Sequence, residues 1–90
     1  MPVRFGLVYD FRNPQRWERP WPEVFAALLE QIEYADTLGF DSIWITEHHF
    51  AADGYAPSPV PLMAAIAART THVKLSTDIL LLPLYHAVKL

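Results

Sequence analysis

The sequence predicts an α/β fold in which strands and helices alternate as β-α-β-α-β and lead into the start of a third helix. Three observations support this prediction. Apolar runs of strand length occur three times, amphipathic segments of helix length separate them, and glycine or proline lies at most of the boundaries. Residues 42–46, Ser-Ile-Trp-Ile-Thr, are rich in β-branched and aromatic side chains. Such a run is typical of a strand that is covered on both faces, as in a parallel sheet.

The chain begins with a predicted strand and a long connection. Residues 3–9 are expected to form a strand that ends at Asp10. The connection at residues 11–22 is longer than the ~2–6 residues usual between a strand and a helix, and long connections are often functional. We consider two roles for it. It is either a surface loop whose tryptophans pack on the following helix, or a lid in which Arg12 or Arg16 faces an anion.

Residues 22–38 are predicted to form the first helix. Pro22 suits its first turn, and Gly39 suits a residue that ends it. Apolar residues recur at spacings of three and four and form one broad face. That face consists of Val24, Leu28, Ile32 and Ala35, with Phe25, Leu29 and Leu38 beside them. The carboxylates that lie largely off this face, and that we expect to be solvated, are Glu30, Glu33 and Asp36.

The second half of the chain repeats the pattern. Residues 41–46 form a second strand, which completes a right-handed βαβ unit with the strand and helix before it. Ser58 suits an N-cap with proline behind it, so a second helix is predicted over residues 59–70. Residues 73–82 are predicted to form a third strand, and a third helix is expected to begin at Tyr85.

Composition excludes several classes of function. The net charge is −3 and there is no basic run, which argues against a nucleic-acid partner. There is no cysteine, so neither disulfides nor thiolate metal sites are possible. No apolar run approaches the ~18 residues of a membrane span. The first residues do not read as a signal peptide, because their apolar run is short and Asp10 follows it. We therefore expect a cytoplasmic protein with no membrane partner.

The length of the chain does not match its pattern. A parallel sheet normally needs several strands and helices on both faces, whereas the 90 residues supply three predicted strands. Three strands also leave two open edges. We therefore expect residues 1–90 to be a single partial domain, truncated from a larger fold.

Ionisable residues fall at the predicted carboxyl ends of all three strands. Asp10 follows the first strand, Glu47 and His48 follow the second, and Asp78 interrupts the third. These ends share one edge in a parallel sheet, which is where ligands bind in such folds. A carboxylate such as Asp78 inside an apolar strand needs a partner. Backbone N–H groups, a ligand's ring nitrogen or an outward bulge would each satisfy it.

The adjacent histidines, His48 and His49, invite a metal site, but the pattern argues against one. Neighbours on a strand point to opposite faces, so these two cannot both ligate one ion. His72 and His86 lie at other places in the predicted fold, and we expect no metal. His48 is either a hydrogen-bonded histidine at the edge of the sheet or a general acid or base, since histidine exchanges protons near neutral pH. Residue chemistry alone does not separate these roles.

Three motifs together resemble the luciferase-like monooxygenase family, which includes bacterial luciferase, alkanesulfonate monooxygenases and deazaflavin-dependent reductases. The motifs are Phe-Asp-Ser-Ile-Trp-Ile-Thr-Glu-His-His-Phe at residues 40–50, Pro-Ser-Pro at residues 57–59 before an Ala-rich helix, and Thr-Asp-Ile-Leu-Leu-Leu-Pro-Leu at residues 77–84. The similarity covers nearly all of the chain but only the amino-terminal quarter to third of a family member. The resemblance implies a TIM (β/α)8 barrel that binds a reduced flavin at its carboxyl rim.

The resemblance also implies roles for individual residues. The first histidine of the pair matches the family's catalytic histidine, so His48 would act as an acid or base on cofactor or substrate. The family's third-strand segment carries a non-proline cis peptide under the flavin ring, which falls here on Asp78-Ile79. The family often has a small or apolar residue at the position of Asp78. The residues that we expect to bind cofactor are Glu47, Thr77, Asp78 and Ile79, and those that we expect to contact substrate are Asp10 and Arg12.

Three functional hypotheses follow from the resemblance. The first is a flavin-dependent monooxygenase that uses reduced FMN and O₂ on a small organic substrate. A flavin reductase is then a possible partner, and the full-length parent is expected to be oligomeric. The second is a deazaflavin-dependent reductase or dehydrogenase, and the third is a non-catalytic flavin-binding or interaction remnant. Under any of them, we expect the 90-residue chain to be inactive alone.

Overall fold

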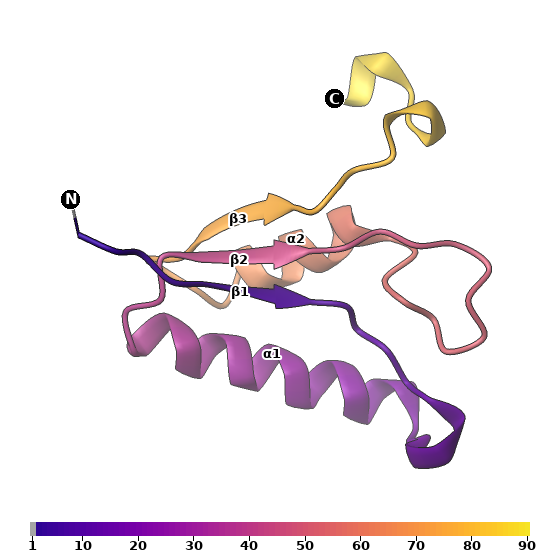
Figure 1. The fold of residues 1–90 in the computed structure, drawn as a ribbon, viewed down its shortest axis with the longest axis horizontal. Coiled ribbons are helices and arrows are strands. Elements are labelled where there is room, and N and C mark those ends of the chain that lie inside the picture. The colour runs from indigo at the N-terminus through magenta and orange to yellow at the C-terminus, as the bar shows by residue number, and fades with distance from the viewer. Residues whose placement is uncertain (1) are drawn as a thin grey trace.

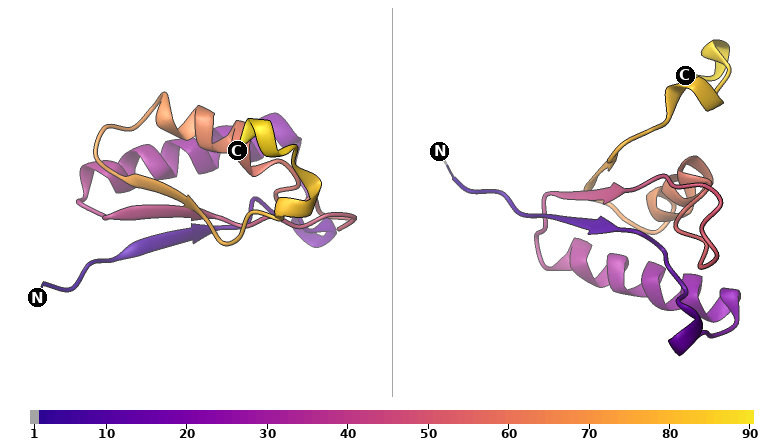
Figure 2. Two further views of the ribbon diagram at one scale, coloured as in Figure 1. Left: turned by 90° about the horizontal axis from the view of Figure 1, so that it is seen from above. Right: turned by 45° about the vertical axis from the view of Figure 1, so that its right-hand side comes forward.

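The computed structural model describes residues 2–90 and contains one three-stranded parallel sheet with two α-helices on one of its faces (Figures 1 and 2). The strands are β1 (Gly6–Tyr9), β2 (Ser42–Ile45) and β3 (Lys74–Thr77), and the helices are α1 (Trp21–Thr37) and α2 (Pro59–Ala67). Three single turns of 3₁₀ helix are η1 (Gln15–Trp17), η2 (Leu82–Leu84) and η3 (Ala87–Lys89). The strand order is β1-β2-β3, and both pairings are parallel. The predicted order of elements and the parallel sheet are confirmed.

The described residues cover only one face of the sheet. In β2, Ile43 and Ile45 are buried against the helices, while Trp44 between them is 38 % exposed. Val8 on β1 is exposed on the same face as Trp44, because the two residues pair in register. The expectation of a strand covered on both faces is therefore wrong for residues 2–90. Two successive crossovers of the same hand place both helices on one side, which the left view of Figure 2 shows.

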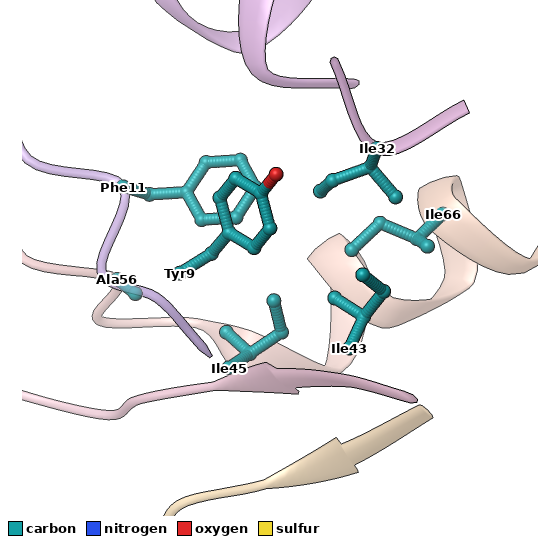
Figure 3. Packing of buried hydrophobic residues seen from close by; sticks show 7 residues of the cluster. All are labelled: Tyr9, Phe11, Ile32, Ile43, Ile45, Ala56 and Ile66. Carbon is teal, nitrogen blue, oxygen red and sulfur yellow. The ribbon is translucent and has the colours of Figure 1, made fainter. Parts of the chain in front are cut away.

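The core lies between the sheet and the helices and contains side chains from all parts of the fold (Figure 3). Its buried members are Tyr9, Phe11, Ile32, Ile43, Ile45, Ala56 and Ile66. The predicted apolar face of α1 contributes Ile32, and Leu28 and Leu29 pack against the same cluster. Ala56 belongs to the loop between β2 and α2. This loop is therefore anchored in the core on one side while its other residues stay at the carboxyl edge of the sheet.

The third strand is shorter than predicted. It ends at Thr77, whereas the apolar run continues to Leu82. The Asp78 N–H still donates to the Ile45 carbonyl oxygen at 2.8 Å, but after this bond the chain leaves the sheet. The run that follows turns into η2, and the expected third helix is the single turn η3.

Asp36 contradicts the expectation that the carboxylates of α1 are solvated. It is 7 % exposed and faces the turn before β3. Its oxygens accept hydrogen bonds from the backbone N–H groups of Thr71, His72 and Val73 at 2.8–2.9 Å, and from the Thr71 hydroxyl at 3.1 Å. These bonds, led by the one from the Thr71 N–H, hold the pKa of Asp36 far below its usual range although burial opposes them.

No helix within residues 2–90 has the length and apolar character to cross a bilayer.

Candidate functional site

Polar side chains follow all three strands at one edge of the sheet, the edge toward which the arrows of Figure 1 point. Asp10 follows β1, residues 46–48 follow β2, and Asp78 follows β3. The Thr46 hydroxyl donates to Asp10 Oδ1 at 3.0 Å, which links the ends of β1 and β2. The Asp78 N–H bond to Ile45 links the ends of β2 and β3 in turn. Asp10, Thr46 and Asp78 thus lie next to one another, in the order of their strands, along the edge where parallel α/β folds bind ligands.

The uncovered sheet face adjoins this edge and is hollowed. A depression of about 380 Å³ is lined by Gly6, Val8, Trp44 and Asp78. Its floor is apolar, and Ile79 beside Asp78 is 64 % exposed. The peptide bond between Asp78 and Ile79 is cis, as the resemblance implies. A flat apolar ligand with polar groups at its border would match this surface in kind.

Gly6 allows Trp44 to lie against the first strand. A Cβ atom at position 6 would collide with Ser42 Oγ and would come within 3.2 Å of Trp44 Nε1. The indole N–H of Trp44 donates to Ser42 Oγ at 2.9 Å, so the three residues form one local arrangement. Glycine is suited to such a close approach because it has no side chain to displace.

Glu47 has a different environment from its neighbour Thr46. Its side chain is 1 % exposed, with Oε1 at 2.9 Å from His49 Nε2 and Oε2 accepting the Leu81 N–H at 2.8 Å. Burial by itself would raise the pKa of Glu47, but hydrogen bonds from Leu81, His49 and Tyr85 outweigh it and lower that pKa. The pKa of Tyr85 is raised, first by burial and then by Glu47. Glu47 therefore ties residues 81–85 to the end of β2.

His48 lies apart from this carboxylate. Its N–H donates to the Tyr55 carbonyl oxygen at 3.2 Å, and its ring lies 3.8 Å from the Tyr55 ring, centroid to centroid, at an interplanar angle of 64°. His48 is exposed. The two adjacent histidines thus have separate partners, since His49 pairs with Glu47. An exposed histidine ring held by its neighbours can exchange a proton with a bound molecule.

Arg12 forms an ion pair with Asp53, a residue of the same chain. Its Nε lies 2.6 Å from Asp53 Oδ2, and its Cζ lies 4.2 Å from the centroid of the Tyr55 ring. The loop after β1 is thereby joined to the loop after β2. In the same loop Trp17 is exposed with Arg16 stacked on it, while Trp21 stacks on Phe25 in α1. Trp21 is itself the first residue of α1, so this contact lies within the helix, and the exposed Trp17 does not show the expected packing of loop tryptophans on the helix.

The residues predicted to bind cofactor are divided between two faces. Asp78 and Ile79 are exposed beside the hollow. Thr77 pairs in register with the buried Ile45, so it lies on the helix side of the sheet, and Glu47 is buried. Strand alternation would have separated these faces once the register was known. A contact between Glu47 and a cofactor would have to compete with the partners that Glu47 already has.

Sequence reasoning missed Gly6, Trp44, Thr46 and Tyr55. Thr46 could have been found from the sequence. It lies two residues after Trp44, so strand alternation places both side chains on the same face of the sheet, near the end of the neighbouring strand. Gly6 and Trp44 could be joined only through the register of β1 on β2. Tyr55 lies seven residues after His48 in a loop, and nothing in the sequence indicates that the loop folds back.

Together the parallel sheet, its one-sided helices and the polar carboxyl edge define the first three strands of an α/β barrel. The model of the luciferase-like monooxygenase family matches residues 3–90, and the chain belongs to that family. Solved structures of the family agree with the fold. The oxygenating constituent of 3,6-diketocamphane monooxygenase from Pseudomonas putida, in complex with FMN, superposes with a TM-score of 0.83 at 30 % identity. That match covers 99 % of this chain and 24 % of that one.

Relatives of established name show the same partial coverage. The oxygenase component of the flavin-dependent trigonelline monooxygenase of Acinetobacter baylyi is 34 % identical over 98 % of this chain and 24 % of its own length. Limonene 1,2-monooxygenase of Rhodococcus erythropolis is 41 % identical over 64 % of this chain and 15 % of its own length. Where the match covers nearly all of this chain, the chain spans about a quarter of its relative.

Proposed function

We propose that this chain forms the first part of a flavin-dependent monooxygenase that uses reduced FMN and O₂ to oxygenate a small organic substrate. Two relatives support the choice of cofactor and reaction. One is named a flavin-dependent monooxygenase, oxygenase component, and the other is a monooxygenase constituent in complex with FMN. An oxygenase component works with a separate source of reduced flavin, so we propose a flavin reductase as a partner. The protein would work in the cytoplasm as an oligomer of complete barrels.

The observation that carries the proposal is the exposed sheet face with its polar border. A flavin ring system is flat and largely apolar, and its hydrogen-bonding atoms lie at its edges. Val8 and Trp44 offer the apolar surface, and Asp78 adds a polar group to its lining. Asp10, which accepts the hydroxyl of the buried Thr46, follows β1 at the same edge of the sheet. The residues present therefore fit the ring portion of a flavin. A phosphate would need cationic donors, and the arginine that follows β1, Arg12, is held by Asp53.

In this proposal the chain binds, orients and moves protons, and the bound reduced flavin supplies the electrons that activate O₂. Asp78 and Ile79 would hold the flavin ring at its border, and Asp10, which accepts the Thr46 hydroxyl at the same edge of the sheet, would contact the substrate. His48 exchanges a proton with the reacting molecule through an exposed ring nitrogen. Positioned acid–base groups of this kind contribute roughly 10²–10⁴-fold to rate.

The proposal can be tested in a chimera. Residues 3–90 replace the matching segment of the Acinetobacter baylyi oxygenase component, which is 34 % identical over 88 residues. We expect the chimera to bind FMN, measured by quenching of flavin fluorescence, and to consume O₂ when reduced FMN is supplied. Hydride transfer with a deazaflavin and no O₂ consumption would instead assign a reductase. Binding of FMN without any turnover would assign a non-catalytic flavin-binding protein.

His48→Ala in this chimera tests the assignment of the proton-exchanging group. We expect turnover to fall by about 10²-fold or more. FMN affinity should stay within roughly two-fold, because the His48 imidazole is exposed at the border of the site and does not lie under the proposed flavin. His72→Ala is the matched control, since His72 lies at the opposite end of the sheet and is exposed. Equal turnover in the two variants would remove His48 from the reaction.

A further inference from the structure

Four side chains from two loops form one cluster beside the proposed site. Arg12 comes from the loop after β1, and His48, Asp53 and Tyr55 come from the loop after β2. Arg12 pairs with Asp53 at 2.6 Å and lies over the Tyr55 ring, and that ring contacts His48. The Asn13 N–H adds a backbone bond to the Asp53 carbonyl oxygen at 2.9 Å. The two loops are therefore joined at three levels: backbone, ion pair and aromatic contact.

The backbone of the second loop is held in an unusual conformation at Tyr55. Gly54, Tyr55 and Ala56 have φ angles of 88°, 56° and 48°. Left-handed conformations are unfavourable for residues with a Cβ and persist where the surroundings hold them. Here the His48 N–H binds the Tyr55 carbonyl oxygen, and Ala56 is 1 % exposed in the core. The loop conformation therefore directs the Tyr55 side chain outward, onto His48.

The Tyr55 ring is engaged by two different groups. A guanidinium over an aromatic face is attracted by the ring's quadrupole, and Asp53 holds this guanidinium in place. The His48 ring meets the same ring edge-on, with the two ring centroids 3.8 Å apart, so the rings are in direct contact. An exposed histidine without such a contact would sample several rotamers. The cluster thus gives the His48 ring a defined orientation at the edge where the other polar groups lie.

We propose that Tyr55 is a positioning residue for His48, and that Arg12 acts on His48 through Tyr55 instead of contacting substrate. This inference rests on the proposed function, in which His48 exchanges the proton. It changes the role expected for Arg12 from the sequence. A histidine nitrogen that is held in the right orientation next to the reacting atom lowers the activation barrier more than a mobile one does. Loss of Tyr55 would therefore lower kcat more than it changes KM.

The test uses the 90-residue chain with ¹³C,¹⁵N-labelled histidine and requires no flavin. In the unmodified chain, we expect nuclear Overhauser contacts between the His48 and Tyr55 rings and ring-current displacement of the His48 carbon-bound protons from free-histidine positions. Tyr55→Leu should move these signals to the free-histidine positions, whereas Tyr55→Phe should preserve the displacement. Arg12→Gln should reduce the displacement, because the ring loses its clamp.

Two controls keep the outcome interpretable. Arg16→Gln removes the other stacked arginine of the first loop, whose partner is Trp17, and should leave His48 unchanged. The signals of His49, which pairs with Glu47, report whether each variant remains folded. Free-histidine signals for His48 in the folded unmodified chain would overturn the proposal, as would unchanged signals in Tyr55→Leu. If Tyr55→Leu fails to fold, unchanged signals in folded Arg12→Gln would overturn the role of Arg12.

These outcomes are separate from the failure of the proposed function. A chain in which Tyr55 orders His48 but whose chimera neither binds flavin nor turns over would lose the function and keep the arrangement. A chimera that turns over with full kcat after Tyr55→Leu would keep the function and lose the positioning role. Restored kcat in Tyr55→Phe is the matching expectation, because the aromatic ring and not the hydroxyl contacts His48.

Discussion

Asp36 and Glu47 are buried carboxylates with lowered pKa values at opposite ends of one sheet, and their partners differ in kind. Asp36 accepts the backbone N–H groups of three consecutive residues, 71–73, just before β3. Glu47 accepts one backbone N–H, from Leu81, and otherwise depends on the side chains of His49 and Tyr85. Asp36 is therefore held at the amino end mainly by main-chain donors, whereas Glu47 at the carboxyl end depends on two side chains as well as one main-chain donor.

The difference matches the separate roles of the two faces of an α/β barrel. Residues at the amino-terminal face of the strands mainly maintain the fold, and those at the carboxyl-terminal face carry chemistry. Removing Asp36 should accordingly affect the whole molecule, whereas removing Glu47 should affect one segment.

Asp36→Asn should produce the largest loss of stability. The amide keeps the size of the side chain and one acceptor oxygen, but it replaces the other oxygen with an NH₂ donor. One of the two sets of hydrogen bonds, either the pair from Thr71 or the pair from His72 and Val73, is therefore lost, and the bonds that remain no longer end on a charged acceptor. We expect Tm to fall by roughly 10 °C when thermal unfolding is measured by far-ultraviolet circular dichroism. Glu33→Gln is the matched control on the same helix, because its ion pair with Arg69 is exposed and should contribute little. Equal Tm values for the two variants would contradict a fastening role for Asp36.

Acid should weaken the chain partly through Asp36. The pKa of Asp36 is depressed in the folded state, so its contribution is fully present above the unfolded value of about 3.9 and is lost as pH falls toward the folded value. The midpoint of urea unfolding should therefore drop as pH is lowered from 5 to 2. The drop should be shallower in Asp36→Asn, which has no carboxylate to protonate there. Parallel curves for the two proteins would assign the acid sensitivity to other groups.

Glu47→Gln should loosen residues 81–85 more than it destabilises the rest of the chain. The neutral side chain binds the Leu81 N–H and His49 more weakly, since hydrogen bonds to a charged group are the stronger ones. We expect amide exchange at Leu81 to accelerate on the order of tenfold, with a smaller change in Tm than in Asp36→Asn. Asp78→Asn removes an exposed carboxylate three residues before Leu81 and should leave this exchange unaltered. Uniform acceleration across the sheet would show that Glu47, like Asp36, holds the whole fold.

The same comparison explains what the sequence could predict. The order of elements followed from local signals: apolar runs of strand length, the helical spacing of α1, and Gly39 or Pro59 at element ends. The polar edge followed as well, because parallel strands all end on one side. The position of Asp36 did not, since periodicity compares a residue with its own helix and its partners lie about 35 residues away. The end of β3 was missed because Ile79 to Leu82 are as apolar as a strand but lie outside the sheet.

The cluster around Tyr55 was beyond sequence reasoning for a related reason. The pairing of Arg12 with Asp53 spans 41 residues, and the left-handed angles at Tyr55 and Ala56 occur at residue types that rarely adopt them. A loop of this kind is specified by what holds it from outside. The sequence therefore predicted that Asp10, residues 47–48 and Asp78 lie at one edge of the sheet, but not which side chains contact each other there.

Gly6→Ala should have the smallest effect and tests whether the uncovered face is already ordered in this chain. The added methyl would collide with Ser42 Oγ, so the hydroxyl must move and release the Trp44 N–H. Because Ser42 and Trp44 are only partly covered, the displacement should cost about 1 kcal/mol. In a chain whose other tryptophans are replaced by phenylalanine, the emission of Trp44 should shift to longer wavelength as the indole becomes more exposed. Ser42→Ala should reproduce the shift without the loss of stability, since it removes the same hydrogen bond and adds no atoms. An emission spectrum that neither change alters would mean that Trp44 is mobile, and the apolar floor proposed for the flavin would then form only when the ligand or the rest of the barrel covers it.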